Sequence, residues 1–247
     1  MSNIDVLRDD VSLDEPTLVE GLPGVGLVGK LATDHLVETF DMCHYANVTC
    51  DSLPPVAMYE EGDRNLSPPV RLYADPEKDL LALRSDVPVA PPAALEFAEC
   101  LGEWTVADDV LPVYLSGIGR EREDGETPAL YGISTGGASD RLDAVDVSPP
   151  EEAGLVSGPT GALLSHAIET DTPALGLVVE ASQRFPDPQA SAHLLEAGIE
   201  PLLDISVPVQ ELTERAQEIR QTKRRLAKQM QSAEEESSKA RPLGMYQ

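Results

Sequence analysis

The chain has 247 residues, of which 41% are hydrophobic and 4% aromatic, so it can bury one sizeable core built mainly from aliphatic side chains. Its 18 Lys and Arg residues against 44 Asp and Glu residues give a net charge of -26, which argues against nucleic acid as a partner because phosphates need a cationic surface. The acid excess is typical of a halophilic protein kept soluble in a salty cytoplasm, and a surface shaped for a basic partner is the alternative.

Cysteine usage and hydropathy indicate the compartment. Cys43, Cys50 and Cys100 are odd in number and have no C-x-x-C spacing, which argues against a disulfide framework or a zinc site. The sequence has no N-terminal signal pattern and no apolar run near the ~18 residues that a membrane span needs. We therefore expect a cytoplasmic protein with no membrane contact.

Short apolar runs alternate with segments of helical spacing along most of the chain. Strands are expected at Thr17–Glu20, Tyr45–Cys50, Val56–Glu60, Val70–Tyr73, Leu80–Leu83, Val110–Leu115, Ala129–Ile133 and Ala174–Val179. Helices are expected at Val25–Phe40, Pro92–Trp104, Thr160–Glu169 and Pro188–Ala197. This alternation predicts a single α/β domain, residues 1–208, with a central, mostly parallel sheet flanked by helices. The Gly- and Pro-containing stretch Glu60–Pro69 predicts a hairpin connection.

The pattern changes at residue 209. Positions spaced by three and four residues form a heptad seam that contains one lysine: Val209, Leu212, Ala216, Ile219, Lys223, Leu226, Met230 and Ala233. The seam predicts a C-terminal helix at residues 209–235, which either packs on its own domain or pairs between subunits of a homo-oligomer. Residues 211–247 hold eight Lys or Arg and six Asp or Glu, a net charge of +2 that leaves -28 for residues 1–210. Residues 236–247 are predicted to be a flexible tail.

Residues 21–30 contain a glycine-rich run that fits two nucleotide-binding motifs. Gly24, Gly29 and Lys30 have phosphate-loop spacing, but Leu31 replaces the hydroxyl residue that would bind magnesium. Gly24, Gly26 and Gly29 also match the dinucleotide fingerprint, with Asp51 where a ribose ligand belongs. A nicotinamide-dinucleotide-binding oxidoreductase is therefore the alternative function.

The same glycines have a structural interpretation. Glycine lets a tight strand-to-helix turn form and lets the helix press closely against the sheet. A second glycine turn into a helix is predicted at Gly158-Pro159-Thr160-Gly161. We assign this role to six residues: Gly21, Gly24, Gly26, Gly29, Gly158 and Gly161.

The histidines give no catalytic or metal pattern. His35, His44, His166 and His193 are scattered, without the H-x-x-x-H spacing of a metal site. Ser165 precedes His166, but no G-x-S-x-G elbow accompanies the pair. We therefore expect no catalytic residue, no metal and no cofactor.

Five segments, taken in order, resemble one family. They are Leu18–Lys30, Leu53-Pro54-Pro55, Tyr131–Gly137, Gly158–Leu164 and Pro186–Ala192. Together they resemble the proteasome assembly chaperone family, in its archaeal branch. The resemblance implies a fold like that of nucleoside phosphorylases and an activity of binding rather than catalysis. It also implies proteasome α subunits or the α ring as partners, and self-association.

The chain ends Met245-Tyr246-Gln247. The resemblance implies a docking role for this triplet, because proteins that bind the α ring often end in a hydrophobic residue, tyrosine and any residue. The terminal carboxylate can pair with a pocket lysine. Tyr246 adds a rigid apolar ring with a hydroxyl, and Met245 adapts to an irregular groove. These three residues are the predicted partner-binding site.

Overall fold

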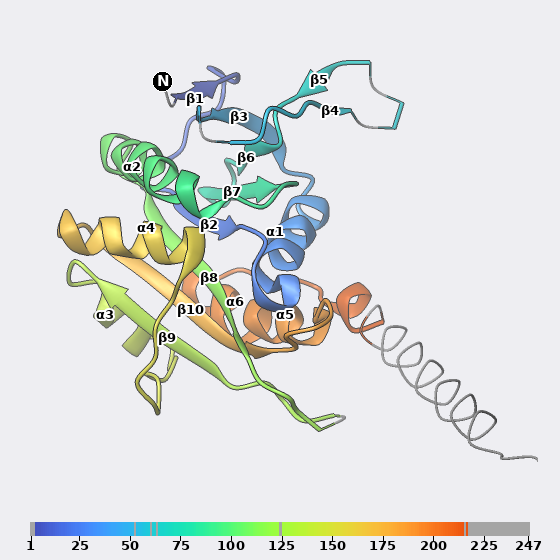
Figure 1. Ribbon diagram of the computed structural model, residues 1–247, viewed down its shortest axis with the longest axis vertical. Helices are drawn as coiled ribbons and strands as arrows, with labels where there is room; N and C mark the ends of the chain where they lie inside the picture. Colours follow the sequence, from blue (N-terminus) through green and yellow to red (C-terminus); the bar gives the residue numbers. More distant parts are fainter. Residues whose placement is uncertain are drawn as a thin grey trace, which may run out of the picture.

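The computed structural model describes residues 3–51, 53–59, 61–62, 64–123, 125–214 and 216. Figure 1 shows one large sheet between two layers of helices. The sheet has eight strands in the order β1-β3-β6-β7-β2-β8-β10-β9, and a short ribbon of β4 and β5 stands apart from it. The four central strands β7, β2, β8 and β10 are parallel, and the strands on both flanks pair antiparallel. The strands are β1 (Asn3–Val6), β2 (Thr17–Gly21), β3 (Cys43–Thr49), β4 (Met58–Tyr59), β5 (Leu66–Ser67), β6 (Val70–Asp75), β7 (Leu80–Ser85), β8 (Leu111–Gly119), β9 (Leu130–Thr135) and β10 (Ala174–Ala181).

Helices cover the two faces unequally. On one face α2 lies beside α4, and on the other α1 lies beside α5, followed by a π-helical turn, η2, and α6 (Figure 1). A short turn, η1, precedes α1, and α3 follows β9. The bounds are η1 (Val25–Leu27), α1 (Val28–Thr39), α2 (Pro91–Ala107), α3 (Ser139–Asp143), α4 (Gly158–Glu169), α5 (Pro188–Leu194), η2 (Leu195–Ile199) and α6 (Glu200–Leu203).

Alternation along the central strands produces two hydrophobic cores. In β2, Leu18 faces the α2 and α4 side, whereas Val19 faces the α1 and α5 side, and both side chains are fully buried. Strands β6 and β7 are buried on both faces, so they are nearly continuous apolar runs. Aliphatic residues dominate both cores, in agreement with the low aromatic content.

The predicted α/β domain with a central sheet flanked by helices is confirmed. Each of the eight predicted strands overlaps an observed strand, whereas the stretch predicted as a hairpin connection, Glu60–Pro69, itself contains β5, which pairs antiparallel with β4. The sequence analysis missed β1, β5, α3 and α6, which span four, two, five and four residues. Within the part of the chain that the structure describes, no helix is both long and apolar enough to cross a membrane.

The beginning of the C-terminal seam packs on its own domain. Residues 210–214 and 216 are helical, and Val209, Leu212 and Ala216 are buried. Leu212 is fully enclosed and belongs to the core on the α1 and α5 face. The seam positions from Ile219 onward, and the tail 236–247, lie outside the described residues. Of the two arrangements that the seam allows, packing on its own domain or pairing between subunits, the first three positions adopt packing on their own domain.

Candidate functional site

The glycine turn follows the carboxyl end of β2, a strand in the middle of the sheet. It begins directly after Glu20, whose carboxylate is buried. Glu20 is fully buried, and its Oε1 accepts a hydrogen bond of 2.8 Å from the Leu22 N–H. Its Oε2 accepts one of 3.2 Å from the Leu115 N–H on β8, and the Thr160 hydroxyl of α4 donates from 3.3 Å. Burial raises the pKa of Glu20 to about 7, although these hydrogen bonds favour the charged form. Glu20 thus ties β2, β8 and α4 together where the turn begins.

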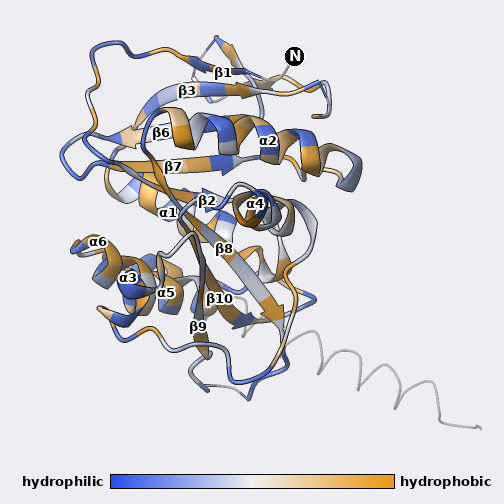
Figure 2. Cartoon of the chain, turned by 90° about the vertical axis from the view of Figure 1, so that its left-hand side faces the viewer, coloured by the Kyte–Doolittle hydropathy of each residue, from blue (hydrophilic) through white to orange (hydrophobic). Residues whose placement is uncertain are grey.

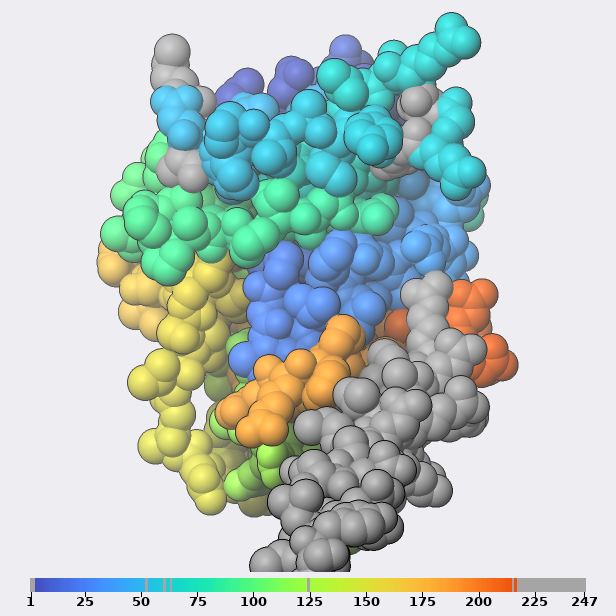
Figure 3. All heavy atoms as spheres, turned by 45° about the vertical axis from the view of Figure 1, so that its right-hand side comes forward, coloured from blue at the N-terminus to red at the C-terminus, as the bar shows by residue number. Residues whose placement is uncertain are grey.

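The turn itself packs against the protein rather than opening toward a ligand. Gly26 has φ 64°, and a Cβ at this position would lie 2.8 Å from Ala181 Cβ and 3.3 Å from Asp187 Cβ. The Asp187 N–H donates a 2.8 Å hydrogen bond to the Gly26 carbonyl oxygen. In the space-filling view, the orange segment around α5 abuts the blue surface of α1 and the turn before it (Figure 3). The turn therefore has no room for a side chain at Gly26.

The other assigned glycines differ in what surrounds them. A Cβ on Gly21 would overlap Thr33 of α1, and one on Gly29 would lie 3.3 Å from Leu115 Cβ. A Cβ on Gly161 would lie 2.5 Å from the Val156 carbonyl oxygen. Gly24 is extended with nothing within 4 Å of a Cβ, and Gly158 has φ 71° in open space. Close packing thus accounts for Gly21, Gly26, Gly29 and Gly161, whereas nothing in the structure explains Gly24.

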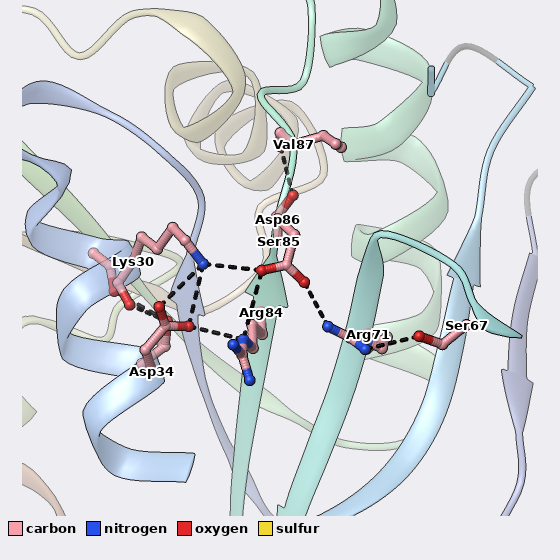
Figure 4. A network of polar contacts seen from close by, with 10 residues as sticks. Lys30, Asp34, Ser67, Arg71, Arg84, Ser85, Asp86 and Val87 are labelled. Carbon is pink, nitrogen blue, oxygen red and sulfur yellow. Dashed lines mark hydrogen bonds and ion pairs between the residues drawn. The ribbon is translucent and has the colours of Figure 1, made fainter. Parts of the chain in front are cut away.

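Lys30, the lysine of the phosphate-loop pattern, is held in an ion-pair network (Figure 4). Its Nζ lies 3.0 Å from Asp34 Oδ2 and 3.2 Å from Asp86 Oδ1. Two arginines complete the network: Arg84 lies 2.9 Å from Asp34, and Arg71 pairs with Asp86. Burial raises the pKa of Asp86, but the cations Lys30, Arg84 and Arg71 together lower it by more. The pKa of Asp86 therefore lies below its ordinary value. Lys30 is therefore paired with two carboxylates, which it shares with Arg84 and Arg71, so the cluster keeps a net charge of +1.

The acid of the dinucleotide pattern is not beside the turn. Asp51 follows β3, and β6 and β7 lie between β3 and β2. Three inter-strand steps separate β3 from β2 by about 14 Å. The acid that follows the neighbouring strand β7 is Asp86, which the ion-pair network occupies. The structure thus does not bring Asp51 and the glycine turn together as a dinucleotide site requires.

A second buried ion pair holds the far side of the turn. Arg122, in the β8–β9 connection, donates to Asp187 Oδ2. The Asp187 carboxylate also accepts hydrogen bonds from the Ser182 N–H at 2.9 Å and from the Ala190 N–H at 3.1 Å, and the second of these caps α5. The backbone N–H of Asp187 donates to the Gly26 carbonyl oxygen. The side chains of Arg122 and Asp187 are about nine-tenths buried. Asp187 therefore links two distant segments to α5: the β8–β9 connection through its carboxylate and the glycine turn through its backbone N–H.

The predicted partner-binding residues, Met245, Tyr246 and Gln247, lie outside the described residues. The residues that organise the turn, namely Glu20, Asp86, Arg122 and Asp187, were missed by sequence reasoning. Glu20 gave a usable signal, because a charged residue inside the apolar run of a central strand needs buried hydrogen-bond partners. Among the described residues, no three His, Cys, Asp or Glu side chains gather as metal ligands.

Comparison with known proteins identifies the family. Residues 18–227 match the PAC2 family, a span that covers most of the chain and includes the turn and both ion-pair clusters. The chain belongs to the PAC2 family. An uncharacterised protein of Methanocaldococcus jannaschii is 27% identical over 241 residues, which cover 96% of each chain.

Two solved structures from Pyrococcus furiosus are similar in fold. PbaA, an archaeal homolog of proteasome-assembly chaperone, is 26% identical with a TM-score of 0.79, and the match covers 96% of this chain and 95% of PbaA. PbaB, an archaeal proteasome activator, is 20% identical with a TM-score of 0.76, and the match covers 92% of this chain and 98% of PbaB. At 20% identity the PbaB likeness concerns the fold alone. The resemblance to the archaeal branch of the proteasome assembly chaperones is confirmed.

Proposed function

We propose that this protein is a chaperone of the proteasome that acts by binding rather than by catalysis. The similarity to PbaA over 96% of the chain carries the proposal. The geometry of the glycine turn supports the binding role, because Gly26 is packed against Asp187 and Lys30 is held in ion pairs with Asp34 and Asp86. The partner under this proposal is the proteasome core particle, contacted at its α subunits.

The proposed contact is the C-terminal triplet Met245-Tyr246-Gln247. Tyr246 supplies an aromatic anchor, and the terminal carboxylate supplies a charge that occurs once per chain. The eleven residues from Ser237 to the end reach roughly 35 Å when extended, which is enough to enter a pocket without moving the domain. If the protein is a homo-oligomer, each copy adds one tail, and the tails together increase the affinity for a ring of subunits.

Removal of the anchor tests the proposal. We expect Tyr246→Ala, or deletion of the last three residues, to weaken binding to immobilised core particles about thirtyfold in surface plasmon resonance, since a buried aromatic anchor typically contributes about 2 kcal/mol. Gln247→Ala is the matched control, because it keeps Met245, Tyr246 and the position of the carboxylate. The thermal unfolding of all variants should equal that of the wild type. Equal core-particle affinity with and without the triplet would assign docking to the globular domain instead.

A further inference from the structure

A groove lies on the α4 side of the sheet. It has a volume of about 850 Å³. Its floor is formed by residues of β8, β10 and β9, one wall is α4, and the other is the loop at residues 150–156. Figure 2 shows α3, α5 and α6 together on one side of β9 and β10, whereas α4 is the one labelled helix beside these strands on the other side. This part of the sheet thus has less helical cover on the groove side.

Burial along the strands shows the same asymmetry. On the α1 and α5 face, the core takes in Leu175, Leu177 and Val179 of β10. On the groove face, the core includes Ala174 of β10 but not Val178, which is partly exposed. Apolar side chains that line the groove also face solvent: Ile118 is 47% exposed, Ile168 67% and Leu155 86%. Exposed apolar side chains gathered around a groove are typical of an interaction site.

The charges at the groove restrict what can bind there. Glu151 and Glu152 are exposed on the loop, and Glu180 lies at the carboxyl end of β10. Arg120 is the cation of the groove lining, and it already pairs with Glu180. Since residues 1–210 also carry a net charge of -28, an occupant needs apolar side chains flanked by basic ones.

One segment of this chain has that composition. Residues 219–233, which we call the basic arm, contain five Lys or Arg and no Asp or Glu. The arm carries the later seam positions, including Ile219, Leu226 and Met230. The earlier positions Val209, Leu212 and Ala216 are buried in their own domain. An apolar seam that continues beyond them in the sequence predicts a further packing surface for the arm.

The positions of the arm and the groove favour contact between the arm of one subunit and the groove of another. Leu212 packs into the core on the α1 and α5 face, whereas the groove lies on the α4 face. An arm that continued the helical pattern would have to turn around the edge of the sheet to reach its own groove. We propose that the groove receives the basic arm of a second copy of this chain. This contact leaves residues 236–247 of each copy free, so it stands independently of the proposed proteasome docking.

A matched pair of substitutions tests the groove. Ile168 on α4 and Leu95 on α2 are both 67% exposed, but Ile168 lines the groove and Leu95 does not. We expect the full-length wild type to be an oligomer by size-exclusion chromatography with light scattering. Ile168→Asp should lower the mass toward the 26.5 kDa of one chain, and Leu95→Asp should leave it unchanged. A monomeric wild type, or an Ile168→Asp variant that is folded and fully assembled, would overturn the proposal.

Charge reversal then tests the arm as the occupant. Glu151→Lys with Glu152→Lys should reduce assembly, and so should Arg224→Glu with Arg225→Glu. All four substitutions in one chain should restore the wild-type mass, because opposite charges face each other again. The measurement belongs in the lowest salt at which the wild type stays folded, since salt screens exposed pairs. Loss of assembly in both double variants without restoration would show that the groove binds a different surface, and would overturn the assignment to the arm.

Discussion

Glu20 is a buried acid without a cationic partner among the contacts that the structure shows. Its carboxylate is held by two backbone N–H groups and the Thr160 hydroxyl. Protonation keeps these contacts possible, because a carboxylic acid oxygen can donate to Thr160 and still accept from an N–H. The folded protein therefore binds a proton at Glu20 more tightly than the unfolded chain does, with a pKa of about 7 against 4.5.

This difference predicts a pH dependence of stability. Between pH 4.5 and 7 the folded state holds the proton and the unfolded state does not, so the free energy of unfolding should fall as pH rises, by about 3 kcal/mol in all. Glu20→Gln should remove this component of the slope and should be least stable relative to wild type at acid pH, because the protonated Glu20 stabilises the wild type most there. Urea unfolding at several pH values measures both effects, with Glu121→Gln on the exposed loop as control. A Glu20→Gln variant with the full wild-type slope would contradict the prediction.

At the scale of the element, two glycines of the same turn, Gly24 and Gly26, differ in whether the fold leaves room for a side chain. Gly26 combines a positive φ with a close approach to Ala181 and Asp187, whereas Gly24 is extended and open. A side chain at Gly26 is strained by the backbone and by its neighbours at once. At Gly24 an added methyl group restricts the unfolded chain without a native clash.

We therefore expect Gly26→Ala to lower the free energy of unfolding by about 1–3 kcal/mol, and Gly24→Ala to change it by less than about 0.5 kcal/mol or to raise it slightly. Chemical denaturation of both variants measures the difference. The same samples with added NAD or ATP test the alternative nucleotide function, because a ligand that binds the folded state raises the melting temperature. Equal effects of the two alanines, or a shift of several degrees with either nucleotide, would contradict the packing role of the turn.

The elements were predictable from sequence where periodicity extended over several residues, as in β2, β7 and α4. Strand β1 was missed because its four residues are largely exposed and gain their structure by pairing with β3. The glycines of the turn were recognisable, but their contacts were not. Asp187 lies 161 positions from Gly26 in sequence, and only the fold brings the two together. For the same reason the sequence predicted Lys30 as a phosphate-loop candidate without its acidic neighbour Asp86.

At the scale of the whole molecule, charge repulsion dominates the electrostatics. The ion pairs described above use a few acids, including Asp34, Asp86, Glu180 and Asp187, whereas the chain contains 44 acidic residues against 18 basic ones. Most acidic side chains therefore repel one another across the surface and oppose the compact state. At 0.1 M salt the Debye length is about 10 Å, which leaves much of this repulsion in place, and at 1 M it is about 3 Å.

We accordingly expect the melting temperature to rise on the order of 5–10 °C between 0.1 and 1 M NaCl, as the repulsion between surface acids is screened. Buried pairs such as Arg122–Asp187 are screened much less than exposed charges, so their loss should not cancel this gain. Differential scanning calorimetry over a series of NaCl concentrations measures the rise, and sucrose at matched osmolality is the uncharged control. A melting temperature that stays constant or falls with added NaCl would mean that attractive pairs outweigh the repulsion, and the halophilic interpretation of the composition would then be wrong.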